Sequence, residues 1–228
     1  MSSRNQHHVE LAIYKETSQV TARAKAGRRH TQHEFEGKEN MPLTKLDTNA
    51  ALIVIDLQKG IVAIPTVHSA AEIVDRTAQL ACAFRERNLP VVLVNVAGRP
   101  PGRTDAGTPT FSFPADWTEL VPELQPHPND HVVSKQRPGA FIGTDLHEYL
   151  RQRGVTQVFI TGIATSLGVE STARSAYDYG YNVVLVVDAM TDRDPDAHRL
   201  SVEKIFPRLA ETDSTNNVLD MLKQTASR

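Results

Sequence analysis

The stretch Ala51-Leu52-Ile53-Val54-Ile55-Asp56-Leu57 begins the strongly apolar part of the chain, with five apolar residues in a row before the first charge. A strand with one solvated face alternates apolar and polar residues, whereas a parallel strand covered on both faces has a nearly continuous apolar run. A second run of this kind, Val91-Val92-Leu93-Val94, follows further along the chain. The pattern predicts a parallel sheet that begins with the first stretch.

Between such runs, apolar residues recur every three or four positions, which is the period of an amphipathic helix. This period is found at about 73–84, 146–150 and 169–177, and the middle segment is followed by Arg153-Gly154, a common helix stop. Strands that alternate with helices are the signature of an α/β fold with a parallel sheet. We predict about six strands, at Ala51–Leu57, Pro90–Val96, His131–Ser134, Gln157–Gly162, Asn182–Asp188 and, for a short sixth, near Leu209–Thr212.

Composition favours one globular domain of the cytoplasm. The chain has 228 residues, of which 40% are hydrophobic and 23% charged, and a single core grows to about this size. No apolar run approaches the ~20 residues that span a bilayer, and the polar start lacks a secretory signal. The net charge of −2 comes without a basic stripe, so we expect neither nucleic acid nor a membrane as a partner. Cys82, the only cysteine, is expected to be a small buried apolar residue.

Two segments differ from the rest of the chain. Residues 1–48 contain four of the nine histidines and few apolar positions, so we predict an N-terminal extension, a surface arm or an oligomer contact, before a body at 49–228. We expect a homo-oligomer, either a dimer or a tetramer. The stretch Gly98–Pro128 contains seven of the thirteen prolines and is too long for a plain connector, which favours a lid or a pocket wall.

Polar residues stand where two predicted strands end, and ligands of open parallel sheets bind outside the carboxyl ends of the strands. Asp56 lies among apolar residues, so it is a candidate acid or base with a raised pKa. Lys135 follows the third strand and is a candidate partner for a substrate carboxylate or for Asp56. Each also has an ordinary interpretation, as a turn aspartate bound to backbone N–H groups and as a solvated lysine.

A third candidate is Gly168, in the stretch Thr161-Gly162-Ile163-Ala164-Thr165-Ser166-Leu167-Gly168-Val169, which runs from a strand directly into a helix. Glycine in the first turn of a helix costs up to about 1 kcal/mol relative to alanine. Free N–H groups at such a helix start can bind an anion or a developing oxyanion. The alternative is a glycine that allows close packing of the helix on the sheet.

Four groups of residues resemble the motifs of the isochorismatase-like hydrolase family, over about residues 50–225. They are Asp56-Leu57-Gln58, then Lys135 with Gly139-Ala140-Phe141, then Gly162-Ile163-Ala164-Thr165 with Ser171-Thr172-Ala173, and Val187-Asp188-Ala189. The resemblance implies a three-layer α/β/α Rossmann-like domain with hydrolase activity. It also implies a catalytic set at Asp56, Lys135 and Gly168, although that family has a cysteine at the third position.

Glycine at residue 168 separates the activities within that family. Nicotinamidase-like and carbamoylsarcosine-amidase-like members attack an amide with the cysteine thiolate, which a glycine cannot do. Isochorismatases have glycine at this point and cleave a vinyl ether, giving pyruvate and a dihydroxy-dihydrobenzoate. The resemblance therefore implies hydrolysis of isochorismate or a related small cyclic carboxylic acid, with Asp56 as the general acid.

Two features leave other activities open. Lys135 beside Asp56 lowers the pKa of a carboxyl group that a general acid needs raised. Isochorismatases tend to have tyrosine where this chain has Ala164, so the substrate is expected to differ. The alternatives are a catalytically silent binding protein with the same fold, and an amidase that uses water or a nucleophile other than cysteine.

The resemblance also implies where a substrate binds. Backbone N–H groups of Ala164 and Gly168 form an oxyanion-type pocket in this interpretation, next to a cis peptide bond between Ile163 and Ala164. We expect no metal ion, no cofactor, and a surface or interface position for His198. The residues expected to contact a substrate are Gln58, Arg103, Trp117, Phe141, Ala164 and Thr165, with Arg99 and Phe113 as further candidates on the long proline-rich stretch.

Overall fold

The computed structural model describes residues 43–105 and 114–225, and in them six strands form one sheet in the order β3-β2-β1-β4-β5-β6. Each of the five neighbouring pairs is parallel. The predicted α/β fold with six strands is confirmed. The strands are β1 (Ala50–Ile55), β2 (Val91–Val96), β3 (His131–Lys135), β4 (Gln157–Ile163), β5 (Asn182–Thr191) and β6 (Glu211–Asp213).

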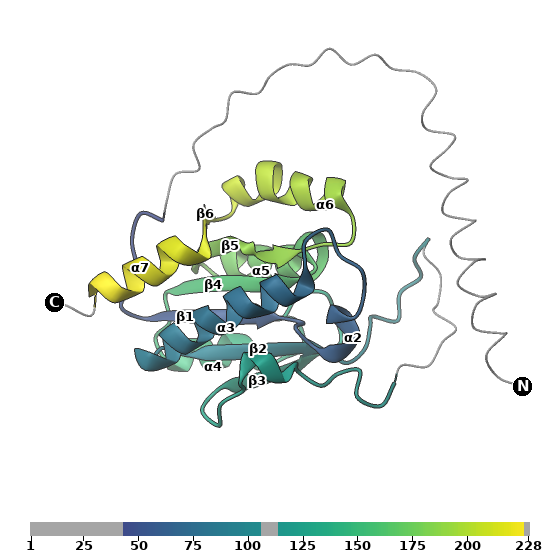
Figure 1. Cartoon of the computed structure of the whole chain (residues 1–228), viewed down its shortest axis with the longest axis horizontal. Helices are drawn as coiled ribbons and strands as arrows, with labels where there is room; N and C mark the ends of the chain where they lie inside the picture. Colours follow the sequence, from purple (N-terminus) through teal and green to yellow (C-terminus); the bar gives the residue numbers. More distant parts are fainter. Residues whose placement is uncertain (1–42, 106–113, 226–228) are drawn as a thin grey trace, which may run out of the picture. The chain divides into compact units, whose positions relative to one another are not determined.

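Helices cover both faces of the sheet and complete three layers (Figure 1). One face carries α3 (Ala70–Glu86) and α7 (Thr215–Thr225), and the other carries α4 (Leu146–Gln152) and α5 (Glu170–Asp178). The remaining helical segments are short. They are α2 (Lys59–Val62), η1 (Pro122–Leu124), η2 (Thr165–Val169), α6 (Pro195–Leu200), η3 (Ser201–Ile205) and η4 (Phe206–Arg208).

Strand β1 lies inside the sheet, and all six of its residues are fully buried. Leu52 and Val54 pack with α3, whereas Ile53 and Ile55 face the other way and pack with α4 and α5. Each such side chain contributes about 1.5–3 kcal/mol by leaving water. The lack of alternation in the opening stretch therefore reflects two apolar cores, one on each face of the strand.

Residues 43–48 fall inside the predicted extension, yet they contact the body. Leu43 is buried in the core that α3 and α7 cover, and its N–H donates to Asp213 Oδ2 at 2.8 Å. Asp47 accepts hydrogen bonds from Thr156 Oγ1 and Asn182 Nδ2 at 2.8 and 2.9 Å. Residues before position 49 thus already pack on the body, at the amino-terminal ends of β4 and β5.

The expectation for Cys82 is wrong, because this residue is exposed. It lies on α3, where Ile73, Leu80 and Phe84 form the buried stripe. Its thiol donates to Glu86 Oε1 at 3.5 Å, one turn further along the same helix. A cysteine is often buried, but its position outside the apolar stripe decides its environment here.

Strand β5 becomes irregular beside β4. Ile160 pairs with Leu185, whereas Gly162 pairs with Met190, so a step of two residues along β4 matches a step of five along β5. The extra residues lengthen β5 to Thr191, three residues past the predicted end. The residues that follow β5 are thereby brought to the same edge of the sheet as the end of β4.

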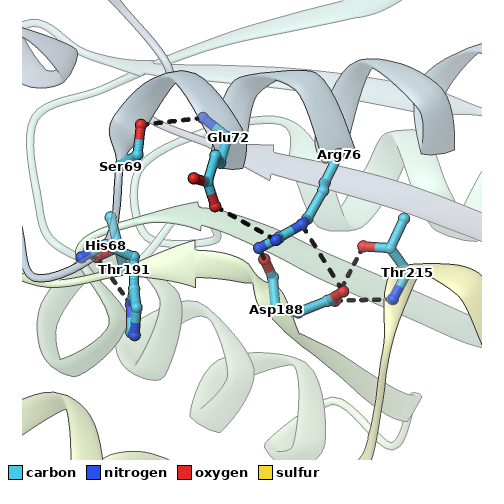
Figure 2. A network of polar contacts seen from close by, with 7 residues as sticks. All are labelled: His68, Ser69, Glu72, Arg76, Asp188, Thr191 and Thr215. Atoms are coloured by element: carbon cyan, nitrogen blue, oxygen red, sulfur yellow. Dashed lines mark hydrogen bonds and ion pairs between the residues drawn. The ribbon is translucent and has the colours of Figure 1, made fainter.

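Asp188 occupies the irregular part of β5 and joins two helices to it. Its side chain accepts hydrogen bonds from Thr215 N and Oγ1 at 2.7 and 2.9 Å, at the start of α7. Its backbone oxygen accepts from Arg76 Nη1 of α3 at 2.6 Å. Figure 2 shows this network beside the contact of His68 with Thr191. The bulge in β5 thus serves as an anchor for α3 and α7.

Gly162 lets β1 and β4 approach each other where the candidate site begins. Its φ is +116°, and a Cβ built there would lie 2.0 Å from the backbone oxygen of Ile55. We predict that Gly162→Ala lowers the free energy of unfolding by about 3 kcal/mol or more, because a backbone atom blocks the new methyl group. Urea unfolding followed by circular dichroism measures the change.

Gly180 offers a matched control, since its φ is +82° but no atom lies within 4 Å of a built Cβ. Gly180→Ala should therefore lower the free energy of unfolding by only about 1 kcal/mol, which is the cost of the left-handed backbone conformation. Equal losses in the two variants would show that the close approach at Gly162 has no energetic weight.

Candidate active site

Three strand ends meet at the candidate site. Asp56 directly follows β1, Lys135 is the last residue of β3, and Gly168 lies in η2 soon after β4. Because all strands are parallel, their carboxyl ends lie at one edge of the sheet. Strand β2 separates β3 from β1, a distance of about 10 Å at the usual strand spacing. The side chains of Lys135 and Asp56 together span it.

Lys135 and Asp56 form a buried ion pair, with Lys135 Nζ 2.7 Å from Asp56 Oδ2. The two residues are only 1% and 5% exposed. Burial raises the pKa of Asp56 to about 6, and the ammonium group of Lys135 opposes this with a smaller lowering effect. Desolvation therefore outweighs the lysine, and the carboxyl group can exchange a proton near neutral pH, as a general acid must.

The other oxygen of Asp56 is unsatisfied. Oδ1 is buried and has no hydrogen-bond partner among the described residues, which costs about 1–3 kcal/mol for a polar atom. Asp56 also has a φ of +53°, a backbone conformation that costs an L-residue roughly 1–2 kcal/mol. Two unfavourable features at one residue that faces a cavity indicate a functional role.

Gly168 lies directly against this carboxyl group. A Cβ built on Gly168 would be 3.3 Å from Asp56 Oδ2 and 2.9 Å from Ile55 Cγ2. A methyl group of Ile55 thus already fills part of the space that a side chain would need. Thr172 Oγ1 donates to Gly168 O at 2.7 Å and accepts from Ala140 N at 3.1 Å. This hydroxyl group joins η2 to the segment after β3.

A cavity of ≈ 290 Å³ opens beside the three residues, all of which line it. Its other walls are mainly apolar, with a few polar groups, which is typical of a site for a small molecule. Asp56 is the only acidic residue in the described lining. The apolar wall includes Ile61, Ile64, Val96, Ile163 and Leu167, and the basic lining residues are Arg99, Lys135, Arg137 and Arg193.

Residues 50–217 match the family model for the isochorismatase domain. The chain belongs to the isochorismatase family. It is 38% identical over 180 residues to the uncharacterized isochorismatase family protein YwoC of Bacillus subtilis, covering 76% of this chain and 94% of YwoC. An isochorismatase family protein from Burkholderia thailandensis has a similar structure, with a TM-score of 0.75 and 42% identity over 78% of this chain and 97% of that one.

A relative with a named activity supports the class of the protein. Streptothricin hydrolase of Streptomyces noursei is 36% identical over 146 residues, which cover 63% of this chain and 50% of that enzyme. The chain is therefore an isochorismatase-family hydrolase, as its motifs predicted.

Among the six residues expected to contact a substrate, all of them in the described part of the chain, only Ala164 lines the cavity. The peptide bond between Ile163 and Ala164 is cis. Ala164 thus lies at the end of β4, beside the cavity.

Two of the six bind other parts of the protein. Gln58 is fully buried, and its side chain binds backbone atoms of Val96 and Trp117 at 2.7–3.1 Å. The indole ring of Trp117 lies against Gly60, where a built Cβ would meet it at 2.0 Å. Both residues thus contact the start of α2, whose Ile61 lines the cavity.

The other three also lie outside the cavity lining. Phe141 is buried, with its ring 5.5 Å from that of Tyr179, and Arg103 is exposed. Thr165 is fully buried, and its hydroxyl group lies 2.9 Å from His198 Nδ1. His198 is half-buried. Of the other two loop candidates, Arg99 lines the cavity, whereas Phe113 lies outside the described residues.

Arg137 and Arg193 line the cavity but were not singled out from the sequence. Arg137 comes two residues after the end of β3, and Arg193 two residues after the end of β5. Both are exposed, and neither guanidinium group has an ion-pair partner in the described part of the chain. The strand-end rule that selected Asp56 and Lys135 covers these arginines as well.

Residues 43–105 and 114–225 show neither a metal-binding cluster of three or more His, Cys, Asp or Glu side chains nor a helix that is long and apolar enough to cross a membrane. A second cavity of ≈ 470 Å³ lies at the amino-terminal ends of β4, β5 and β6. Its buried Gln157 already binds the backbone of Lys45 and Asp47.

We predict that Lys135→Met raises the pKa of Asp56 above about 6, because the ammonium group that lowers this pKa is lost while burial remains. Carboxyl ¹³C NMR titration of Asp56 measures the shift. Lys223→Met removes an exposed lysine of α7 and should leave the titration unchanged. An unchanged or lower pKa in Lys135→Met would contradict the assigned balance between burial and charge.

Proposed function

We propose that this isochorismatase-family hydrolase acts without a covalent intermediate and cleaves the vinyl ether, or a related bond, of a small cyclic carboxylic acid. Isochorismate is the lead substrate, giving pyruvate and a dihydroxy-dihydrobenzoate. The observation that carries the proposal is the Asp56 carboxyl group, which has a pKa of about 6 and an unpartnered oxygen and faces the cavity at Gly168. Asp56 is the proposed general acid.

The proposed reaction begins with protonated Asp56. Its proton passes to the methylene carbon of the enol ether, and the resulting oxocarbenium ion takes up water, which returns a proton to Asp56. The hemiketal then breaks into pyruvate and the ring alcohol, so the sum is addition of one water molecule. Negative charge develops on Asp56 in the transition state, 2.7 Å from Lys135 Nζ. A fixed cation at this distance stabilises that charge.

The surroundings of Gly168 argue against the thiolate route. The methyl group of Ile55 lies 2.9 Å from a Cβ built at residue 168, so the packing fits glycine. Cys82, the only thiol of the chain, is exposed on α3 and does not line the cavity. A nucleophilic thioester route therefore lacks its nucleophile in this site.

The charge of the lining favours an acid as the substrate. Three arginines line the cavity, and its one acidic residue is already paired with Lys135. Arg137 follows β3, Arg193 follows β5, and Asp56 follows β1. In the sheet order, β3 and β5 each lie two places from β1, on opposite sides. Guanidinium groups suit carboxylates because they donate two parallel hydrogen bonds. Cations thus flank the proposed acid, while the apolar walls suit a ring.

Two alternatives are less well supported. Some relatives are named ureidoacrylate amidohydrolases, so an amidase that activates water is the second candidate. A silent binding protein is the third, but it has no need for a buried, unsatisfied carboxyl oxygen at the cavity wall. Both alternatives are tested by the same assay with amide substrates and with isochorismate.

We predict that Asp56→Asn lowers kcat/KM for isochorismate by about 100-fold or more, since the amide cannot donate the proton. Pyruvate release, coupled to lactate dehydrogenase, measures turnover. For the unmodified protein, kcat/KM should fall about tenfold per pH unit above pH 6, because the active form is the protonated acid.

Asp75→Asn is the matched control, because it changes an exposed aspartate of α3. A kcat/KM that instead rises with pH through 6 would make Asp56 a base and favour water activation on an amide. Absence of pyruvate release by the unmodified protein would remove isochorismate as the substrate.

We predict that Arg137→Gln and Arg193→Gln each raise KM for the acid roughly tenfold with little change in kcat. The reason is that contacts far from the reacting bond bind the substrate and the transition state alike. Steady-state kinetics measures both constants. Arg199→Gln, which removes an exposed arginine of α6 paired with Asp196, is the control. An unchanged KM in both cavity variants would exclude the arginines from substrate binding.

A further inference from the structure

Segment η2 must be held in place from outside. It is a five-residue π-helical turn without a side-chain cap, and it places Gly168 so that a built Cβ would be 3.3 Å from Asp56 Oδ2. It also follows Ala164, which lines the cavity after a cis peptide bond. A shift of about 1 Å in such a turn can cost on the order of 100-fold in rate.

The segment after β5 holds η2 at two successive residues. Asp192 Oδ2 accepts hydrogen bonds from both Ser166 N and Ser166 Oγ at 2.7 Å. One residue earlier, Thr165 Oγ1 lies 2.9 Å from Nδ1 of His198 on α6. Thr165 is fully buried, so the loss of this partner would leave its hydroxyl group unsatisfied, at a cost of about 1–3 kcal/mol.

His198 is itself fixed by its neighbours. Helix α6 starts at an N-cap, Asp194, whose side chain accepts from Asp196 N and Ala197 N. The ring of His68 packs edge-on against the His198 ring, with centroids 4.9 Å apart. His68 is held by Thr191, which accepts from His68 N at 3.0 Å, and Figure 2 shows this pair at the end of β5.

The charge state of His198 allows its ring to accept a hydrogen bond. Burial lowers its pKa, the nearby His68 lowers it further, and Asp192 has an opposing, smaller effect. The neutral ring therefore predominates at pH 7, and its Nδ1 can accept a hydrogen bond from the Thr165 hydroxyl group. His198 does not line the cavity, so it reaches the candidate site only through Thr165.

We propose that His198 is a positioning residue of the active site: by accepting the hydrogen bond of the Thr165 hydroxyl group it holds η2 in the position where Gly168 faces Asp56. The proposal rests on the proposed function only in taking Asp56 as the reacting group. His68 supports His198, and Asp192 supports the same turn one residue later. Neither histidine touches the substrate in this arrangement.

Two substitutions remove the contact from either side. His198→Leu and Thr165→Val should each lower kcat about 100-fold while KM for isochorismate changes less than about threefold. The double variant should be no worse than either single one, about 100-fold rather than about 10,000-fold, because both remove the same interaction. Thr165→Ser and His198→Asn keep polar groups at the contact and should recover most of the activity.

His147 provides the matched control. It is also half-buried, and its Nδ1 also binds a hydroxyl group, that of Tyr181, at 3.0 Å, but on α4 and away from the cavity lining. The kcat of His147→Leu should stay within about twofold of that of the unmodified protein, even if its melting temperature falls as far as that of His198→Leu.

A second measurement does not depend on turnover. The amide NMR signal of Gly168 and the titration of Asp56 should shift in His198→Leu and Thr165→Val, and stay in place in His147→Leu. If no variant releases pyruvate, the proposed function fails while these signals still decide the present proposal. Unshifted Gly168 and Asp56 signals, or additive losses in the double variant, would overturn it.

Discussion

The buried ion pair between Asp56 and Lys135 is the interaction on which the rest of the site depends. A charge pair this deep loses the hydration of both groups, and the attraction between them often does no more than offset that loss. Replacing such a buried pair by hydrophobic residues of similar volume is often neutral or even stabilising. The pair is therefore better explained by chemistry than by stability. It places a carboxyl group whose pKa is about 6 at the wall of a cavity.

The precision of the site comes from supports on several elements. Gly168 offers no side chain, so its position depends on what holds η2. Thr172 binds its carbonyl group, and Asp192 and His198 bind the two residues at the start of the turn. These supports come from α5, the end of β5 and α6. The irregular pairing of β5 brings two of them to the correct edge of the sheet.

Much of the fold was readable in the sequence because burial on both faces leaves continuous apolar runs. The same logic found Asp56 and Lys135, since a charge directly after such a run must lie at a strand end. It failed for Cys82, where residue type suggested burial but the helical stripe decided otherwise. It was not extended to Arg137 and Arg193, which lie two residues beyond strand ends. It also gave no hint of the contact of His198 with Thr165, because a contact between distant segments leaves no mark in local periodicity.

The length of β5 and the state of η2 show a second limit of sequence patterns. Three extra residues in β5 form a bulge that the sequence does not reveal, because Val186 and Ala189, on either side of the half-buried Asp188, are buried like their regular neighbours. Likewise, the helical period at 169–177 continues backwards as a π-helical turn, a difference in hydrogen bonding that does not alter which residues are apolar.

The contact between Ile55 and Gly168 also limits which residues this position can hold. A Cβ at residue 168 would lie 2.9 Å from Ile55 Cγ2, so any side chain there needs Ile55 to shift or to be replaced. A nucleophile could therefore be introduced at residue 168 only together with a change in β1. The packing of one strand thus restricts the chemistry that a single substitution can give this site.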